Sequence, residues 1–334
     1  MMKVAHLLDD FAMGGVTRAL SLFERPALSR LAMSNVVPIA ADALIAPRID
    51  ADCIVDHMAL SWKRLVFLAQ LRSRHPRARI VHVEHSYTRA FEQDHVPAKT
   101  RFRTMLKLAA SLVDEIVCVS YAQRDWMAQT VGIPAGKLCV IYPWTDPADL
   151  FAIEPLAKGR NGPTRLLAYG RYAPVKNFAA LIEAMRDISP DMAELTIFGD
   201  GPDRPALETL AGDVPHVRVL GPSRSPSAYL AQCDAVIIPS KVEAFGLVAT
   251  EARMAGRAIF VADVDGLPEQ ARHGGHVGPM AGAKDIAAAI RTAAESDLVA
   301  MGAIGREDVR GQSSEIVARW ADLFERAAGE RLAA

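Results

Sequence analysis

Two glutamates, Glu243 and Glu251, lie eight positions apart in the segment EAFGLVATE. An apolar run, residues 235–238, precedes this segment and another, residues 258–262, follows it, which predicts two buried parallel strands joined by a helix. Ligands of such sheets bind beyond the carboxyl ends of the strands. We therefore expect a binding site here, because carboxylates accept hydrogen bonds from hydroxyl groups and a helix amino end favours an anion.

Two cations, Arg171 and Lys176, follow a further apolar run, residues 165–169, and flank a turn at Pro174. Positive charges placed at a strand end before a helix suit a diphosphate, because its charge must be neutralised as it leaves. The two pairs of residues together favour chemistry in which a diphosphate is the leaving group.

This pattern resembles family GT4 of the retaining glycosyltransferases, which have the GT-B fold. The resemblance lies in the E-x7-E signature with FGL inside it, in PS before it and GLPE after it, and in GR-x4-KN and GDGP earlier in the chain. It implies that Glu243 contacts the sugar hydroxyls, that Glu251 contacts the ribose hydroxyls, and that Arg171 and Lys176 stabilise the diphosphate. The other donor-binding residues that it implies in this half are Gly170, Gly221, Ala244, Phe245, Gly246 and Leu247.

The resemblance is weaker in the first half of the chain, where fewer residues match the family's motifs. Gly14 and Gly15 lie where a first strand, residues 3–8, turns into a helix near Val16, and the family has a similar loop near the donor diphosphate. A tight turn explains the two glycines equally well. His85 stands at the end of the strand predicted at residues 79–83, where the family places a histidine facing the donor sugar, although a lone histidine is also often structural.

Apolar runs and helical patterns alternate along the chain, which predicts an α/β protein with parallel sheets. In the first half we expect strands at residues 35–40, 52–57, 115–120 and 138–142 and helices at residues 61–73, 97–113 and 121–130. The resemblance implies two Rossmann-like domains facing across a cleft. We place them at residues 1–156 and 157–312, divided at the Gly- and Pro-containing stretch 157–164, and expect a helix at residues 313–334 that packs back on the first domain.

Length and composition agree with two domains. The chain has 334 residues, 51% of them hydrophobic, and a net charge of −1, which argues against a general nucleic-acid binder. No apolar run is long enough for a membrane span, and no signal peptide precedes the first strand, so we expect a cytoplasmic protein. The four cysteines lack metal-site spacing and are expected to be buried thiols.

Basic residues gather between residues 63 and 107, and three of them, Lys99, Arg103 and Lys107, lie four apart on one predicted helix. Ordinary amphipathic packing explains this stripe. Many members of the family act on lipid-linked acceptors, however, and the stripe would also suit peripheral contact with an anionic membrane at its inner face.

The resemblance implies transfer of a hexose from a UDP- or GDP-linked donor to a saccharide or lipid-linked acceptor of cell-envelope or exopolysaccharide synthesis, with retention and without metal or cofactor. The chain departs from the family at residues 143–146, which lack the usual Asn-Gly, and at Ala258, where proline is common. The first domain is also short for the family, so a non-catalytic nucleotide-sugar-binding regulator or scaffold is the alternative. A nicotinamide dehydrogenase is disfavoured, because the first turn lacks G-x-G-x-x-G.

Overall fold

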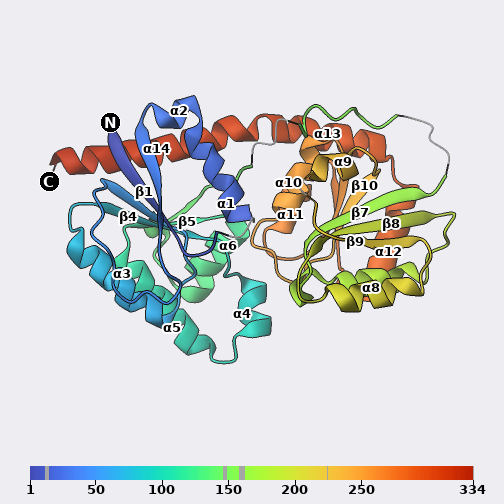
Figure 1. Ribbon diagram of the computed structural model, residues 1–334, viewed down its shortest axis with the longest axis horizontal. Helices are drawn as coiled ribbons and strands as arrows, with labels where there is room; N and C mark the ends of the chain where they lie inside the picture. Colours follow the sequence, from blue (N-terminus) through green and yellow to red (C-terminus); the bar gives the residue numbers. More distant parts are fainter. Residues whose placement is uncertain (12–14, 146–148, 158–161, 224, 334) are drawn as a thin grey trace. The chain divides into compact units, whose positions relative to one another are not determined.

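The computed structural model describes residues 1–11, 15–145, 149–157, 162–223 and 225–333. Contacts divide the chain into two compact units, Met1–Asp146 with Ser313–Ala334 (unit 1) and Pro147–Gln312 (unit 2) (Figure 1). This division assigns residues 147–156 to unit 2 and groups the end of the chain with the first unit.

Unit 1 contains a parallel sheet of six strands in the described part of the chain, in the order β2-β1-β3-β4-β5-β6. Short apolar runs form its central strands because both faces are covered. The bounds are β1 Met2–Leu8, β2 Ala32–Pro38, β3 Cys53–Asp56, β4 Arg79–Glu84, β5 Glu115–Cys118 and β6 Leu138–Val140.

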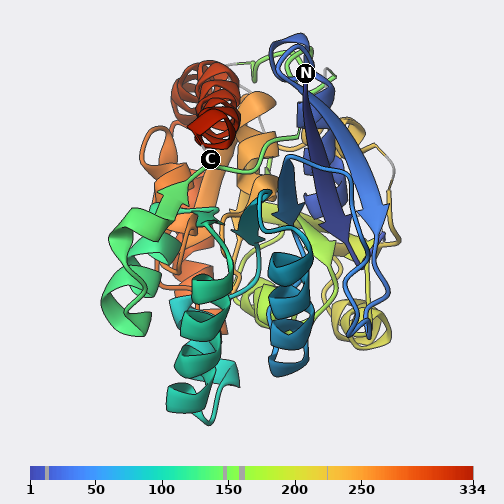
Figure 2. The ribbon, with the colours of Figure 1, turned by 90° about the vertical axis from the view of Figure 1, so that its left-hand side faces the viewer.

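Three helices of unit 1 begin at side chains that accept a hydrogen bond from the first turn. Ser61, Thr88 and Ser120 cap α3 (Trp62–Arg74), α4 (Arg89–His95) and α6 (Tyr121–Trp126) in this way. Helices α3 and α5 pack together and cover one face of the sheet (Figure 2). The other elements are α1 Gly15–Ala19, η1 Leu20–Glu24, α2 Pro26–Ser29, α5 Lys99–Leu112, η2 Met127–Val131 and η3 Ala135–Lys137.

The final helix, α14 (Gln312–Ala333), contacts the body of unit 1 through residues in its middle. The ring of Trp320 lies edge-on to Phe23 with centroids 4.9 Å apart, and Arg326 forms an ion pair with Glu115 at 3.1 Å. These contacts attach the last segment of the chain to elements more than two hundred residues earlier.

Unit 2 repeats the architecture, with six described parallel strands in the order β12-β11-β10-β7-β8-β9. The strands are β7 Thr164–Arg171, β8 Ala193–Asp200, β9 Val217–Leu220, β10 Ala235–Ile238, β11 Ala258–Ala262 and β12 Gly275–Gly278. The helical elements are η4 Pro174–Lys176, α7 Phe178–Met185, α8 Arg204–Gly212, α9 Pro226–Leu230, α10 Leu247–Met254, α11 Leu267–Ala271, α12 Ala283–Glu295 and α13 Leu298–Arg310.

The predicted alternation of strands and helices is present in both units, and the runs at residues 235–238 and 258–262 form strands with those bounds. β2 begins three residues earlier than predicted, because Ala32 pairs with Met2. β12 and α13 are among the elements that were not predicted, and each contains two glycines that weaken the sequence signal. In α13, Gly302 is required because a side chain there would collide with the backbone oxygen of Gly256.

Two expectations from composition are tested by the fold. All four cysteines are free; Cys53, Cys118 and Cys233 are buried, as predicted, whereas Cys139 is partly exposed. Within the described residues, no helix combines the length and the apolar character needed to cross a membrane.

Candidate functional site

Lys176 and Glu243 meet at the carboxyl edge of the second sheet. Lys176 ends the short helix after β7, Glu243 lies between β10 and α10, and the lysine ammonium forms an ion pair with Glu243 Oε2. Ser240 donates a second hydrogen bond to the same oxygen at 3.2 Å. About a fifth of each charged side chain is exposed, 22% for the lysine and 17% for the glutamate, so a ligand can reach both.

Backbone contacts hold the two loops of this ion pair together. The amide of Lys241 donates to the carbonyl of Val175 at 2.8 Å, which connects the loop after β10 to the turn after β7. Asn177 adopts a left-handed conformation (φ 58°), and its side-chain amide donates to the carbonyl of Met280 at 2.9 Å. The turn is therefore fixed on both sides of Lys176.

Asp265 positions the backbone of Glu243. Its carboxylate accepts from the Glu243 amide at 3.3 Å, and the next amide, of Gly266, donates to the Glu243 carbonyl at 3.2 Å. Asp265 has a positive φ of 45°, which costs a non-glycine residue free energy and is retained where surrounding structure imposes it. Asp265 directly precedes the GLPE motif, but its role was not predicted from the sequence.

The loop then passes into α10 through Ala244, Phe245 and Gly246, all of which are buried. Gly246 has a φ of 91°, and a side chain there would lie 2.6 Å from a methyl group of Leu267. Glycine is therefore required by the backbone and by packing, reasons that the sequence analysis did not give. The helix starts at Leu247, so its amino end lies beside the ion pair.

Arg171 is the last residue of β7, next to Gly170, whose φ is 139°. Its side chain is exposed and, within the described part of the chain, forms no ion pair or hydrogen bond. A side chain added at Gly170 would lie 3.9 Å from the Lys176 stem, which places the two predicted cations on the same turn.

Glu251 lies deeper than the other predicted site residues. It is 1% exposed, and its Oε2 accepts a hydrogen bond from the Tyr169 hydroxyl at 2.7 Å. Tyr169 stacks on Phe198 with centroids 4.7 Å apart, and Phe198 stacks on Tyr229 at 4.5 Å. Tyr169 was not predicted as a site residue, although it directly precedes the Gly-Arg pair.

Gly221 follows β9 and lies next to the guanidinium group of Arg204. A side chain added there would meet the guanidinium of Arg204 at 3.3 Å. The preceding carbonyl, of Leu220, accepts a hydrogen bond from the buried Tyr172 hydroxyl at 2.6 Å. Backbone of Tyr172 also excludes any side chain at Gly201, so this tyrosine organises both the GDGP turn and the strand end at Gly221.

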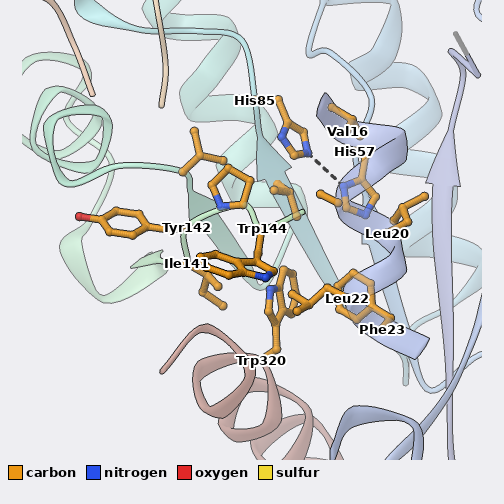
Figure 3. A pocket seen from close by; sticks show the side chains of 14 residues that line it. Val16, Leu20, Leu22, Phe23, His57, His85, Ile141, Tyr142, Trp144 and Trp320 are labelled. Carbon is orange, nitrogen blue, oxygen red and sulfur yellow. Dashed lines mark hydrogen bonds between the residues drawn. The ribbon is translucent and has the colours of Figure 1, made fainter. Parts of the chain in front are cut away.

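In unit 1, His85 follows β4 and borders a small cavity of about 30 Å³. Val16, Phe23, Trp144 and Trp320 supply apolar walls of this cavity, and Figure 3 shows His57 joined to His85 by a hydrogen bond on its border. Gly15 begins α1, whereas Gly14 lies outside the described residues.

A second buried cluster lies beside these histidines. His82 Nδ1 is 3.0 Å from Asp56, and Nε2 is 3.5 Å from Glu84. Burial alone would lower the pKa of His82, but the hydrogen bonds and charges of the two carboxylates raise it to about 9. His82 lowers the pKa of Glu84 in return, against the effect of burial. In the described residues no set of three such side chains could hold a metal ion.

The stripe of three cations is only partly available on the surface. Lys99 and Lys107 are exposed. Arg103 instead donates two hydrogen bonds to the buried carboxylate of Glu92, at 2.6 and 3.1 Å, and Trp126 donates a third at 3.1 Å. Arg103 therefore anchors α5 to α4.

Two family descriptions match the chain. Residues 15–149 match Glycosyltransferase Family 4, and residues 163–296 match Glycosyl transferases group 1. An exopolysaccharide phosphotransferase of Streptomyces coelicolor is 31% identical over 70% of this chain and 26% of its own length. A phosphatidyl-myo-inositol mannosyltransferase of Mycolicibacterium smegmatis is 31% identical over 58% of this chain and 52% of its own. The chain thus spans between a quarter and about half of these relatives.

Solved structures share the fold. HepE of Anabaena, in complex with UDP-glucose, aligns with a TM-score of 0.78 at 20% identity and covers 98% of this chain and 100% of its own. A sucrose-phosphate synthase from Thermosynechococcus elongatus aligns with a TM-score of 0.78 at 19% identity, over 99% of this chain and 100% of its own. The two Rossmann-like sheets are therefore those of the GT-B fold.

Proposed function

Because the chain belongs to the family 4, group 1 glycosyltransferases of the GT-B fold, we propose that it transfers a hexose from a nucleotide diphosphate sugar to an acceptor hydroxyl with retention of configuration. The observation that carries this proposal is the meeting of Lys176 and Glu243 beside the amino end of α10. One group carries the charge that a diphosphate needs, and the other accepts hydrogen bonds from sugar hydroxyls.

In the proposed reaction, the bond between the anomeric carbon and the diphosphate breaks through an oxocarbenium-like transition state. Negative charge grows on the diphosphate as it departs, the acceptor oxygen bonds to the anomeric carbon on the same face, and the departing phosphate takes the proton of the acceptor hydroxyl. Lys176, Arg171 and the amide groups at the start of α10 stabilise this charge in the transition state more than in the ground state, which lowers the barrier.

Donor binding changes the partner of Lys176. Without donor, the ammonium is neutralised by Glu243; the arriving diphosphate takes over part of this interaction, and Glu243 turns its free acceptor capacity to the sugar. Glu251 accepts hydrogen bonds from the ribose, and the Tyr169 hydroxyl holds it in place. Gly221 offers its backbone to the base, and by the family resemblance Gly14, Gly15 and His85 of the first half of the chain also contact the donor.

The proposed reaction requires no metal or cofactor, because two cations and a helix amino end supply the positive charge that a metal would provide. Activity is therefore expected to persist in a chelator such as EDTA. Its loss on chelation, with recovery on adding Mg²⁺ or Mn²⁺, would contradict this part of the proposal.

The proposed acceptor is a saccharide or lipid-linked intermediate of cell-envelope or exopolysaccharide synthesis. Relatives named for exopolysaccharide and phosphatidylinositol chemistry support this class. Exposed Lys99 and Lys107, with Arg101 over the exposed ring of Trp62, favour contact with an anionic membrane at its cytoplasmic face. Vesicle sedimentation tests it: binding to anionic but not neutral vesicles, weakened by salt and by Lys99→Glu with Lys107→Glu, is expected.

The activity is tested by incubating the full chain with UDP-glucose or GDP-mannose and saccharide acceptors. Release of the nucleoside diphosphate together with a product of unchanged anomeric configuration by NMR is expected. Tight binding of the sugar nucleotide without any release would instead support a non-catalytic regulator.

A further inference from the structure

Three histidines of unit 1 form a hydrogen-bonded row. His6 lies in β1, His57 follows β3 and His85 follows β4, and these strands are neighbours in the sheet. His6 Nδ1 is 3.0 Å from His57 Nε2, and His57 Nδ1 is 3.1 Å from His85 Nε2. The rings stack with centroids 5.3 and 5.4 Å apart, and Figure 3 shows the second of the two hydrogen bonds.

Burial keeps all three rings neutral near pH 7. Burial lowers the pKa of His6 to about 3 and that of His85 to about 4, and it also lowers the pKa of His57, which neighbouring histidines lower further. The charged groups facing the row are His82, which is held between Asp56 and Glu84, and those two carboxylates.

Neutral imidazoles allow only two arrangements of the row. Each ring carries one N–H and one bare nitrogen, so every donor in the row must meet a bare nitrogen. Either all three rings carry the proton on Nδ1, with His6 donating to His57 and His57 donating to His85, or all three carry it on Nε2 and the direction is reversed.

The end of the row at His6 distinguishes the two arrangements. His6 Nε2 is buried and has no hydrogen-bond partner, and the His6 ring packs against Phe23 with centroids 4.2 Å apart. The first arrangement leaves a bare lone pair there, whereas the second buries an N–H without an acceptor. Buried unpaired N–H groups are the rarer of the two in proteins, which favours the first arrangement.

We propose that His6 and His57 are positioning residues that hold His85 in the tautomer with its proton on Nδ1, so that His85 donates a hydrogen bond to a substrate oxygen. His85 is partly exposed, and its Nδ1 has no hydrogen-bond partner among the described residues yet is not sealed from solvent. In this state the ring nitrogen that faces a ligand is a donor and does not act as a base. The proposed function enters only through the identity of this oxygen, which belongs either to the sugar nucleotide or to the molecule that receives the sugar.

NMR of the full chain labelled with ¹⁵N-histidine tests the tautomers directly, because long-range ¹H–¹⁵N correlations distinguish a protonated ring nitrogen from a bare one. His85→Asn and His57→Gln assign the signals. Protonated Nδ1 on His6, His57 and His85 in the unsubstituted protein is expected at pH 7. Protonated Nε2 on these rings would overturn the proposal, whether or not glycosyl transfer has been detected.

His6→Met tests whether the row controls the tautomer of His85. The Met thioether cannot donate to His57 Nε2 but is a weak acceptor, so His57 and His85 are expected to show a population with protonated Nε2, and turnover to fall about two- to tenfold. His75→Gln is the matched control, because it removes another buried histidine of unit 1 outside the row. An unchanged His85 tautomer in folded His6→Met, or the same change in the control, would contradict the positioning role.

Discussion

The carboxyl edges of the two sheets use polar residues in opposite ways. In unit 2, Lys176 and Glu243 are partly exposed and share one ion pair, while Arg171 is exposed and has no ion pair in the described residues. In unit 1, His6 and His57 are fully or largely buried and, with His85, bonded in a neutral row. The first edge suits an incoming anion, and the second suits precise hydrogen bonding without charge.

The largest expected effect is on turnover and comes from substitutions at the carboxyl edge of the sheet in unit 2, where Lys176 and Glu243 meet. Lys176→Ala and Glu243→Ala should each lower turnover by about a hundredfold or more, roughly 3 kcal/mol of transition-state stabilisation, because each removes a charged contact to the reacting donor. Steady-state rates of nucleotide release, with thermal melts to show that the fold survives, measure this effect.

Lys241→Ala is the matched control for this prediction. Lys241 is an exposed lysine of the same loop, and only its backbone amide is used to join the loop to Val175. Its substitution should leave turnover nearly unchanged. Equal losses in Lys176→Ala and Lys241→Ala would show that general surface charge, not the ion pair, matters.

The buried histidines of unit 1 should make the stability of this unit depend on pH. The pKa of His82 is raised to about 9, so its contribution is complete below pH 6.5 and is lost as the pH rises through 9, on the order of 3 kcal/mol. The pKa values of His6 and His85 are lowered to about 3 and 4, so their contributions are lost as the pH falls below 6.5. Stability should therefore be greatest near neutral pH.

Tryptophan fluorescence measures this dependence in unit 1 alone, because all four tryptophans, Trp62, Trp126, Trp144 and Trp320, lie there. Thermal unfolding followed between pH 5 and 9 should show a maximum, and His82→Gln should remove the decline above pH 6.5. A decline of equal slope in His82→Gln would exclude His82 as its origin.

A smaller effect, on the KM, is expected from the buried hydrogen bond between Tyr169 and Glu251. Tyr169→Phe removes the hydroxyl that donates to Glu251 and should raise the KM for the sugar nucleotide about three- to tenfold with little change in turnover at saturation. Tyr229→Phe, at the other end of the same aromatic stack, serves as the control. A KM change in the control as large as that in Tyr169→Phe would point to the stack instead of the hydrogen bond.

The smallest expected effect concerns Asp265. Asp265→Gly relieves the positive φ but removes the carboxylate that accepts from the Glu243 amide, so turnover should fall a few-fold while the melting temperature stays the same or rises. Asp265→Asn retains a side-chain oxygen and tolerates the same backbone conformation, so it should keep more activity. A large loss of stability in Asp265→Gly would contradict this interpretation.

The two edges also differ in how far the sequence predicts them. Glu243, Arg171 and Lys176 lie in compact motifs at strand ends, and the neighbouring strands β7 and β10 bring the lysine and the first glutamate together. The histidine row could not be found in this way, because no motif marks His6 or His57, and the three histidines meet only through the strand order β1-β3-β4. Tyr169, Asp265 and Tyr172 were missed because their roles depend on partners in other elements.

Calorimetric titration of UDP and GDP, each against its nucleoside, tests the central claim that unit 2 binds the diphosphate through its cations. The protein should bind its preferred nucleoside diphosphate far more tightly than the nucleoside, and Arg171→Ala with Lys176→Ala should abolish most of that difference. Equal affinity for nucleoside and diphosphate, or an unchanged difference in the doubly substituted protein, would contradict the claim.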